Sequence, residues 1–296
     1  MAALNKEMKV LITGADGQLG RSFQDALKLK GIDFLALSRK TMDVSNLDQV
    51  RSVVGSSGAT LIINSAAYTN VEQAEINPEI AFAINQNGAR NMAIVSRELG
   101  SRLIHISTDY VFSGNRELPW QVDSDVNPLS VYGKSKLAGE KAIEEEWSEN
   151  SLIVRTAWLY SQYGKNFYKT ILQLANKDKS PIKVVNNQIG QPTSASELAS
   201  FILSTLPLEI PAGVYHATNS GSATWYDFAY SIFQSAGADT GRIEPIRAED
   251  YKAKAPRPDY SVLDNSKWDS YDLNTLGDWK DSVAEAFSTI QESMNK

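Results

Sequence analysis

Near its start the chain reads Lys9-Val10-Leu11-Ile12-Thr13-Gly14-Ala15-Asp16-Gly17-Gln18-Leu19-Gly20. An apolar run over residues 9–13 passes directly into a loop with glycines at 14, 17 and 20, and helical spacing over residues 19–30 follows. Such glycines suit a tight turn, close approach of the backbone to a pyrophosphate, and close packing of helix on strand. The helix N-terminus would offer N–H groups and a positive dipole end to the anion. Because strand, loop and helix come in the required order, the stretch predicts a dinucleotide site rather than an ordinary turn.

Short apolar runs continue to alternate with helical segments along the chain. The runs that we expect to form strands are residues 9–13, 34–37, 61–64, 103–107, 152–156, 182–185 and 214–216. The segments with helical spacing are residues 19–30, 46–54, 78–99, 132–146 and 166–176. Nearly continuous apolar runs are typical of strands buried on both faces of a parallel sheet. The pattern therefore predicts right-handed βαβ units and an α/β fold with a doubly wound parallel Rossmann sheet.

After about Tyr160 this alternation becomes less regular, because Pro and Gly are more frequent and irregular segments separate the apolar runs. We therefore expect a dinucleotide-binding domain over residues 1–160 and a smaller, mixed α/β substrate-binding lobe over residues 161–296. The chain is expected to return to the first domain around residues 182–217.

Composition excludes several classes of function. The 296 residues carry 29 Lys+Arg against 35 Asp+Glu, and this acidic balance argues against a nucleic-acid partner. Without Cys and with only His105 and His216, the chain cannot form disulfides, thiolate metal sites or His-rich metal sites. No apolar run approaches the roughly 20 residues of a membrane helix, and residues 1–7 lack the apolar core of a signal peptide. We expect a cytoplasmic protein with no membrane partner.

The residues after the second predicted strand indicate which dinucleotide binds. An acidic residue there would hold a ribose 2′-hydroxyl, whereas Arg accommodates a 2′-phosphate. The chain has Ser38-Arg39-Lys40 at this point and no acidic residue before Asp43, which favours NADPH over NADH. A solvated basic turn is the alternative interpretation. Asp43 and Val44 are expected to flank the adenine.

Two side chains in the fourth helical segment are suited to proton transfer. Tyr132 and Lys136 lie four residues apart, so they share one helix face. A phenol has an ordinary pKa of about 10, and we expect the ammonium, together with an oxidised nicotinamide, to lower the pKa of Tyr132. The pair would then protonate a carbonyl that is being reduced, although by itself it is also compatible with a surface pair. Thr108 follows a buried strand, where its hydroxyl would orient the carbonyl.

Together these features resemble the extended short-chain dehydrogenase/reductases, which share a TGxxGxxG loop, a Ser or Thr, and YxxxK. Within them the chain is similar to the dTDP-4-dehydrorhamnose reductase family. The stretches that carry this closer resemblance are residues 64–69, 107–112, 131–140, 155–158, 192–193 and 257–258. The resemblance implies that NADPH, with NADH as the other option, reduces the 4-keto group of a dTDP-linked 4-keto-6-deoxyhexose to give dTDP-L-rhamnose.

The residues and the resemblance together predict a set of site residues. Catalysis is assigned to Thr108, Tyr132 and Lys136. Cofactor contacts are expected from Gly14, Asp16, Gly17, Gln18, Leu19, Gly20, Ser38, Arg39, Asp43, Val44, Ala66, Ala67, Tyr68, Tyr132 and Lys136. Substrate contacts are expected from Thr69, Val71, Thr108, Asp109, Tyr110, Trp158, Asn166 and Arg257.

The two phosphates of a dTDP-sugar require local positive charge. Lys252, Lys254 and Arg257 lie in a segment without acidic residues, and the planar fork of Arg257 suits a diphosphate. A solvated basic loop is the alternative. Trp158 can stack on the base or line the sugar pocket, or it can belong to the core.

Differences from the sequence motifs of related enzymes argue against dehydration and epimerisation. Nucleotide-sugar 4,6-dehydratases carry Asp-Glu after the Thr, and GDP-fucose synthases use a Cys and a His for epimerisation. Here Tyr110 follows Asp109 and the chain has no Cys, which favours simple reduction. Members of the family with a metal-bridged dimer have a Glu where this chain has Ser22, so we predict no metal, and a homodimer stays open. Two other functions stay open: reduction of another nucleotide-linked ketosugar, and a non-catalytic role similar to the regulatory β subunit of methionine adenosyltransferase.

Overall fold

A six-stranded parallel sheet forms the centre of the molecule. The computed structural model describes residues 8–177, 180–251, 253–271, 273 and 276–295. In spatial order β10-β5-β4-β3-β1-β2, the strands are all parallel to their neighbours. Their bounds are β1 Val10–Thr13, β2 Phe34–Leu37, β3 Leu61–Asn64, β4 Arg102–Thr108, β5 Ser151–Thr156 and β10 Gly213–His216. This confirms the predicted doubly wound α/β class.

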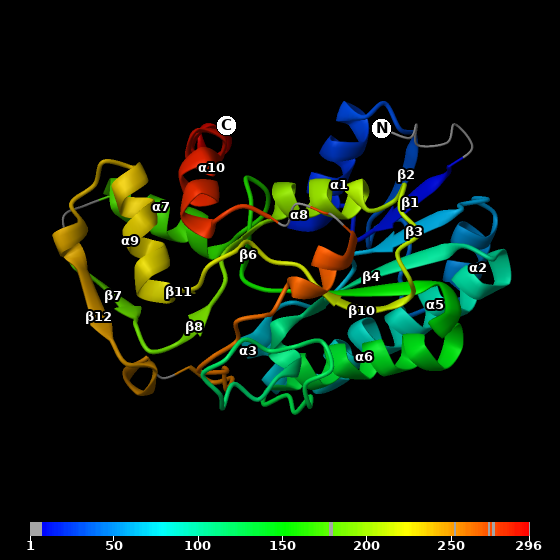
Figure 1. The fold of residues 1–296 in the computed structure, drawn as a ribbon, viewed down its shortest axis with the longest axis horizontal. Helices are drawn as coiled ribbons and strands as arrows, with labels where there is room; N and C mark the ends of the chain where they lie inside the picture. The colour runs from blue at the N-terminus through cyan, green and yellow to red at the C-terminus, as the bar shows by residue number, and fades with distance from the viewer. Residues whose placement is uncertain (1–7, 178–179, 252, 272, 274–275, 296) are drawn as a thin grey trace.

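Helices cover both faces of this sheet (Figure 1). On one face lie α1 Gln18–Leu29 and α8 Ala195–Ser204, and on the other lie α2 Leu47–Gly55, α5 Gly88–Leu99 and α6 Val131–Trp147. Successive strand residues point to opposite faces, so Ile12 packs in the cluster that contains Phe23 of α1. Its neighbour Leu11 packs in the cluster that contains Met92 of α5. Burial on both sides therefore accounts for the continuous apolar runs.

The helical segment predicted over residues 78–99 is divided in the structure. It consists of α4 Pro78–Phe82, the π-helical turn η1 Ala83–Asn87, and α5. In the π turn, the Asn85 side chain bonds the backbone of Tyr68 and the hydroxyl of Ser135. π turns of this kind are frequent at functional sites. The short helix α3, Val71–Ile76, precedes this region.

A smaller lobe lies beside the carboxyl ends of the strands, on the left of Figure 1. Its apolar cluster is formed mainly by the helices α7, α9 and α10. Its principal elements are α7 Phe167–Lys177, β7 Ile182–Val185, β8 Ile189–Gly190, β11 Ala223–Thr224, α9 Trp225–Ser235, β12 Ile243–Ile246 and α10 Trp279–Met294. The remaining short elements are β6 Leu159–Tyr160, β9 Thr193–Ser194, η2 Asp109–Val111, η3 Ser148–Asn150, η4 Thr240–Arg242, η5 Ala248–Asp250 and η6 Ser266–Tyr271.

The prediction that residues 182–185 belong to the main sheet is wrong. β7 pairs in parallel with β12 in a separate two-stranded sheet. Only its last two residues, Val184 and Val185, are buried, whereas Lys183 is exposed, so β7 lacks the burial along its whole length that β1, β3 and β5 of the main sheet have. The chain returns to the main sheet through α8 and β10, and the division at residue 160 stays a prediction. Within the described ranges, no helix combines the length and apolar character needed to cross a membrane.

Candidate active site

The glycine loop between β1 and α1 is shaped by contacts that only glycine allows. Gly14 has φ +67°, and a Cβ there would lie 2.7 Å from the backbone of Ser65 and Ala66. A Cβ on Gly20 would lie 2.3 Å from the Gly14 carbonyl oxygen. Gly17 is the N-cap of α1 and makes no side-chain capping bond. The first-turn N–H groups of α1 are therefore without a cap from that residue, as an anion site requires.

A cavity of about 290 Å³ lies beside this loop. Two predicted cofactor residues, Asp16 and Ser38, line it. It is also lined by Arg21 and Lys28 of α1 and by Tyr163, none of which we predicted. The spacing of Arg21 and Lys28, seven residues apart on one helix face, is a sequence signal that could have identified them.

The turn after β2 is held by its own side chains. Asp43 accepts hydrogen bonds from the Ser45 N–H at 2.9 Å and hydroxyl at 2.7 Å. These bonds lower the pKa of Asp43, and the nearby Arg39 guanidinium adds to that effect. Val44 is buried, and its carbonyl accepts from Asn91 of α5 at 2.9 Å. Asp43 and Val44 are thus rigid parts of the turn beside the exposed Arg39.

The segment after β3 is fixed to α6, the helix that carries Tyr132 and Lys136. Asn85 accepts from the Tyr68 N–H at 2.7 Å, donates to the Tyr68 carbonyl at 3.1 Å, and donates to Ser135 of α6 at 2.9 Å. This places Ala66 and Ala67 between the glycine loop and α6. Of the predicted substrate residues nearby, Thr69 is exposed and Val71 begins α3.

Capping and close packing position α6. The Ser130 hydroxyl accepts from the Gly133 N–H at 3.1 Å, and a carboxylate oxygen of Glu75 accepts from the Val131 N–H at 2.7 Å. A Cβ on Gly133 would lie 2.2 Å from the Tyr110 carbonyl oxygen, so only glycine allows α6 to approach that backbone. The helix start is therefore held directly against the segment that follows β4.

Thr108, Asp109 and Tyr132 meet at the carboxyl end of β4. The Thr108 hydroxyl donates to Asp109 Oδ1 at 3.0 Å and accepts from the Tyr110 N–H at 3.2 Å. The ring of Tyr132 meets that of Tyr110 edge-on, with centroids 5.6 Å apart. Burial raises the pKa of Tyr132 to about 12, a hydrogen bond with Thr108 works in the opposite direction, and Asp109 adds to the rise.

The expectation that Lys136 lowers the pKa of Tyr132 is therefore wrong for this structure. The Lys136 ammonium points elsewhere: Nζ donates to the Ile106 carbonyl at 2.6 Å and lies 3.2 Å from His105 Nε2. The side chain is 1% exposed. Burial lowers the pKa of Lys136 to about 8, and Glu140 one turn further along the helix opposes that change.

A buried ion pair lies next to Lys136. Glu140 of α6 pairs with Arg155 of β5 at 2.7 Å, with side chains 2% and 5% exposed. Glu140 also accepts the hydroxyl of Ser107, the residue before Thr108. The Arg155 guanidinium lies over the ring of Phe112 at 5.1 Å and donates to the Val122 carbonyl. The pair therefore ties α6, β4 and β5 together directly behind the predicted catalytic residues.

The buried Asp109 gives a stability prediction with a definite sign. Burial raises its pKa from 3.8 to about 6, partly opposed by hydrogen bonds from Ser261 and Thr108. Between these two values the folded chain binds the proton more tightly than the unfolded chain, so stability falls as pH rises through the window. The difference corresponds to about 3 kcal/mol. Asp109→Asn removes this titration, so its unfolding free energy relative to wild type should increase between pH 4 and pH 7.

Urea unfolding at a series of pH values checks this expectation. Asp33→Asn, at an exposed position, is the matched control. An Asp109→Asn variant whose stability difference from wild type stays constant across the window would contradict the buried, proton-binding state of Asp109.

The predicted diphosphate ligand Arg257 is already ion-paired. Its guanidinium donates to Glu72 of α3 at 2.7 Å, and Glu72 also accepts from the Lys254 and Ala255 N–H groups. Burial and Asp109 raise the pKa of Tyr110, and the adjacent Arg257 opposes that rise. Arg257 therefore lies next to Tyr110, beyond the carboxyl end of β4, and is held by an acidic residue that we did not predict. Lys252 lies outside the described residues.

Trp158 and Asn166 make other contacts. Trp158 has φ +43°, stacks on Trp225 with ring centroids 3.5 Å apart, and is partly buried. A Cβ on Gly190 would lie 2.5 Å from its indole. Asn166 donates to the side-chain oxygen of Gln18 at 2.9 Å, so it connects the lobe to the predicted cofactor residue Gln18. Neither residue contacts the Thr108–Tyr132 group through a hydrogen bond or ring contact within the described ranges.

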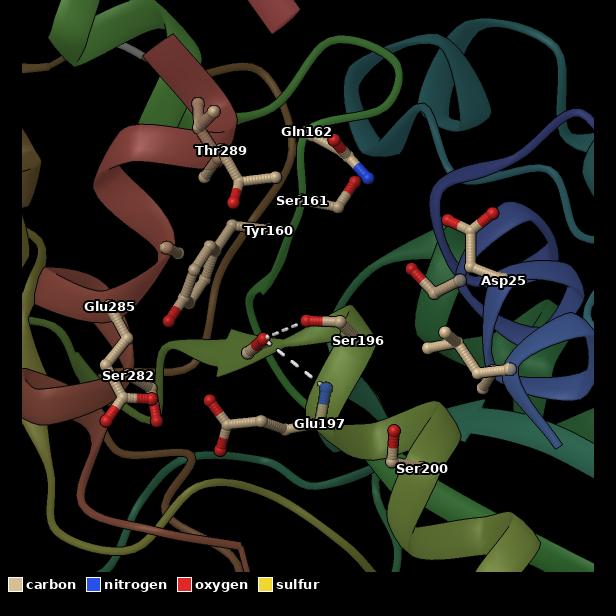
Figure 2. Close-up of a pocket in the computed structure, with 16 residues that line it drawn as sticks. Asp25, Tyr160, Ser161, Gln162, Ser196, Glu197, Ser200, Ser282, Glu285 and Thr289 are labelled. Carbon is tan, nitrogen blue, oxygen red and sulfur yellow. Dashed lines mark hydrogen bonds between the residues drawn. The ribbon is translucent and has the colours of Figure 1, made fainter. Parts of the chain in front are cut away.

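A second cavity, of about 350 Å³, is not lined by Thr108, Tyr132 or Lys136. It opens between α1, α8, α10 and the segment after β6, and Figure 2 shows Tyr160, Glu197 and Glu285 around it. The Ser194 hydroxyl, which lies 2.9 Å from the Ser196 hydroxyl, accepts from the Glu197 N–H. Ser22 also lines this cavity. Across the described residues, no three His, Asp or Glu side chains gather as a metal site.

Comparison with known proteins matches nearly the whole chain. Residues 8–292 match the family model described as RmlD substrate binding domain. The dTDP-4-dehydrorhamnose reductase of Streptomyces griseus is 39% identical over 284 residues, which is 95% of this chain and 93% of that protein. The spore coat polysaccharide biosynthesis protein SpsK of Bacillus subtilis is 41% identical over 255 residues, 86% of this chain and 88% of that protein. The Bacillus anthracis dTDP-4-dehydrorhamnose reductase, solved in complex with NADP, superposes with a TM-score of 0.91 at 37% identity, covering 95% of this chain and 99% of that one.

Proposed function

Because the chain belongs to the RmlD substrate binding domain family, we propose that it is a reductase that uses NADPH to reduce the 4-keto group of a dTDP-linked 4-keto-6-deoxyhexose. The substrate proposed is dTDP-4-dehydro-L-rhamnose, and the product is dTDP-L-rhamnose. Relatives that carry the name dTDP-4-dehydrorhamnose reductase align over most of the chain, which supports this substrate.

One observation carries the proposal. Thr108 ends β4, while Tyr132 and Lys136 lie one turn apart on α6, and contacts of Tyr132 with Thr108 and of Lys136 with Ile106 bring the three together at the carboxyl end of β4. Ligand chemistry in doubly wound sheets takes place at this edge. A regulatory protein that only binds a partner would not require a half-buried phenol, a hydroxyl and a buried ammonium at this place.

The chain's own residues account for carbonyl reduction. When the substrate binds, the Thr108 hydroxyl would turn its single hydrogen from Asp109 Oδ1 to the carbonyl oxygen. Tyr132 would donate to the same oxygen, so that the two hydroxyls polarise the carbonyl and hold it in place. The Tyr132 hydroxyl would then deliver its proton to that oxygen as the alcohol forms. Lys136, on the same face of α6 as the phenol, would hold the ribose of the cofactor, and Asp109 holds the Thr108 hydroxyl at the end of β4 until the substrate binds. Tyr110 and Arg257 would bound the sugar and diphosphate.

The residues around the glycine loop fit a dinucleotide. Without a Cβ, Gly14 lies close to the segment after β3 and Gly20 of α1 lies close to the Gly14 carbonyl, and α1 begins without a side-chain cap. A cavity lined by Ser38 and Arg21 lies alongside. NADPH bound there would supply the hydride that adds to the carbonyl carbon.

Arg39 is proposed to select NADPH over NADH. Replacing Arg39 with Ala removes a charged donor for the 2′-phosphate, a loss worth about 1.5–3 kcal/mol. We expect kcat/KM for NADPH to fall about 10–100-fold, while the value for NADH changes little. Steady-state kinetics with both cofactors measure this, and Lys30→Ala, an exposed cation at the C-terminal end of α1 and before β2, is the control. Equal losses with both cofactors would contradict the assignment.

Arg257 is proposed to bind the substrate diphosphate. Arg257→Gln should raise KM for the dTDP-ketosugar about 10–100-fold and leave KM for NADPH unchanged, because one charge-assisted contact is lost. Arg247→Gln is the matched control, since Arg247 is likewise paired with a Glu, here Glu249, but both side chains are exposed. The assignment fails if the Arg257 variant shows the wild-type KM for the ketosugar.

The function itself is tested by following nicotinamide absorbance with the enzymatically generated ketosugar. We expect rapid NADPH oxidation with the dTDP-linked substrate and much slower oxidation with a UDP- or GDP-linked ketosugar. Equal rates would favour another nucleotide-sugar reductase, and no oxidation with any ketosugar would favour a regulatory binding protein. Association into a homodimer, which light scattering would detect, stays a prediction.

A further inference from the structure

A buried chain of polar side chains connects the glycine loop to Lys136. Thr13, Asn64 and His105 are neighbours across β1, β3 and β4, because Thr13 is in register with Asn64 and Asn64 with His105. Thr13 Oγ1 lies 2.6 Å from Asn64 Oδ1, and Asn64 Nδ2 lies 2.9 Å from His105 Nδ1. His105 Nε2 lies 3.2 Å from Lys136 Nζ. None of the four residues is more than 2% exposed.

The donors and acceptors of this chain depend on the charge of Lys136. A neutral imidazole has one N–H and one lone pair. If Nδ1 accepts from the Asn64 amide, Nε2 carries the hydrogen and faces Nζ, and an ammonium has no lone pair to accept it. An imidazolium does not resolve this conflict, since burial and Lys136 hold the pKa of His105 well below its usual value. Either the lysine is a neutral amine, or the Asn64 amide is turned end for end.

We propose that His105 is a positioning residue for Lys136, and that its ring hydrogen changes nitrogen when Lys136 changes charge. Opposite an ammonium, Nδ1 carries the hydrogen and donates to Asn64 Oδ1, while Nε2 accepts from Nζ. Opposite a neutral amine, Nε2 carries the hydrogen and donates to Nζ, Nδ1 accepts from Asn64 Nδ2, and Thr13 donates to Asn64 Oδ1. The ring holds one hydrogen in both states, so the states differ by the single proton lost from Nζ.

The charge of Lys136 depends on its neutral hydrogen-bond partners, because the acidic side chains around it make other contacts. β4 supplies His105 and the Ile106 carbonyl. On α6 itself Glu140 is already paired with Arg155 of β5, and Tyr132 lies one turn back. From η2, Asp109 faces the phenol rather than Nζ. The His105 lone pair is thus one of two acceptors that hold the ammonium, and its removal should make the charged lysine harder to maintain.

Kinetics with two variants test the positioning role, which rests on the proposed function because it calls Lys136 catalytic. His105→Leu leaves Nζ with the Ile106 carbonyl alone, so the alkaline limb of kcat/KM should move about 1–2 pH units to lower pH. His105→Gln supplies a side-chain carbonyl and should restore most of the profile. His216→Gln is the control, because the other histidine is equally buried on β10 and bonds the Asp264 carbonyl instead. An unmoved limb in a folded, NADPH-binding His105→Leu protein would overturn the role.

Nitrogen-15 NMR of the wild-type protein and of Lys136→Met tests the exchange without any measurement of turnover. With only two histidines in the chain, both rings can be assigned, and the shifts of the two ring nitrogens identify which one carries the hydrogen. We expect His105 to change from the Nδ1–H to the Nε2–H form as Lys136 loses its proton, and to keep one form in Lys136→Met. A single His105 form throughout the wild-type titration, or an imidazolium, would refute the inference. Inactivity on dTDP-ketosugars would refute the proposed function and leave the NMR result standing.

Discussion

Tyr132→Phe should lower turnover of the dTDP-ketosugar by about 10²–10⁴-fold, the contribution typical of a positioned general acid. The phenol is the group that meets Thr108 at the carboxyl end of β4, and phenylalanine keeps the ring contact with Tyr110 while removing the transferable proton. NADPH affinity should stay within a few-fold of wild type, because the glycine loop and the turn after β2 are untouched. Stopped-flow turnover and fluorescence titration of NADPH measure the two effects separately.

Tyr168→Phe is the matched control for this substitution. Tyr168 is also buried, but its hydroxyl bonds the Val283 carbonyl in the core of the lobe at 2.9 Å. Its loss should cost stability and leave turnover near the wild-type value. Turnover of Tyr132→Phe comparable to that of Tyr168→Phe would rule out Tyr132 as the proton donor.

Glu140→Gln should destabilise the protein by about 3–5 kcal/mol, since it leaves the guanidinium of Arg155 buried without a countercharge. The pair is 2–5% exposed and also holds Ser107, so the loss reaches the strand end that carries Thr108. Turnover should fall together with stability. Urea unfolding at pH 7 gives the free energy of unfolding. A shift of the urea midpoint at an unchanged dependence of this free energy on urea concentration identifies a change in stability.

An exposed pair provides the comparison for Glu140. Arg51 and Glu98 are joined at 2.8 Å, but their side chains are 47% and 42% exposed, and Glu98→Gln should cost at most about 1 kcal/mol. The double replacement Glu140→Leu with Arg155→Met should cost less than the sum of its single changes, because neither charge is then left alone. Similar losses of unfolding free energy in Glu140→Gln and Glu98→Gln would contradict the larger contribution expected from the buried Glu140–Arg155 pair.

The main sheet could be predicted because its strands are buried on both faces. Continuous apolar runs mark such strands wherever they fall in the chain, so β1 to β5 and β10 lie within one or two residues of their predicted positions. Nothing in a run of four residues specifies its partner, and residues 182–185 pair with β12 instead of joining the main sheet. The π turn at Asn85 was also hidden, because helical spacing cannot distinguish a continuous helix from one with an inserted residue.

The predicted site shows the same limit of local sequence. Spacing alone brings Tyr132 and Lys136 onto one face of α6, and the strand end positions Thr108. Their electrostatic partners come from distant segments: Glu72 lies 185 residues before Arg257. The position of His105 could have been recognised from the sequence, because it is a polar residue inside an apolar run. It lies two residues after Leu103, so both side chains point to the sheet face covered by α6.

Deuteride transfer from NADPH that carries deuterium at both positions of the nicotinamide C4 tests the central claim most directly. Incubation with the enzymatically generated dTDP-4-dehydro-L-rhamnose should give a dTDP-sugar one mass unit heavier, with deuterium at C4 of the hexose in the NMR spectrum. A product with hydrogen at C4, or deuterium at any other carbon, would contradict reduction of the 4-keto group by this protein.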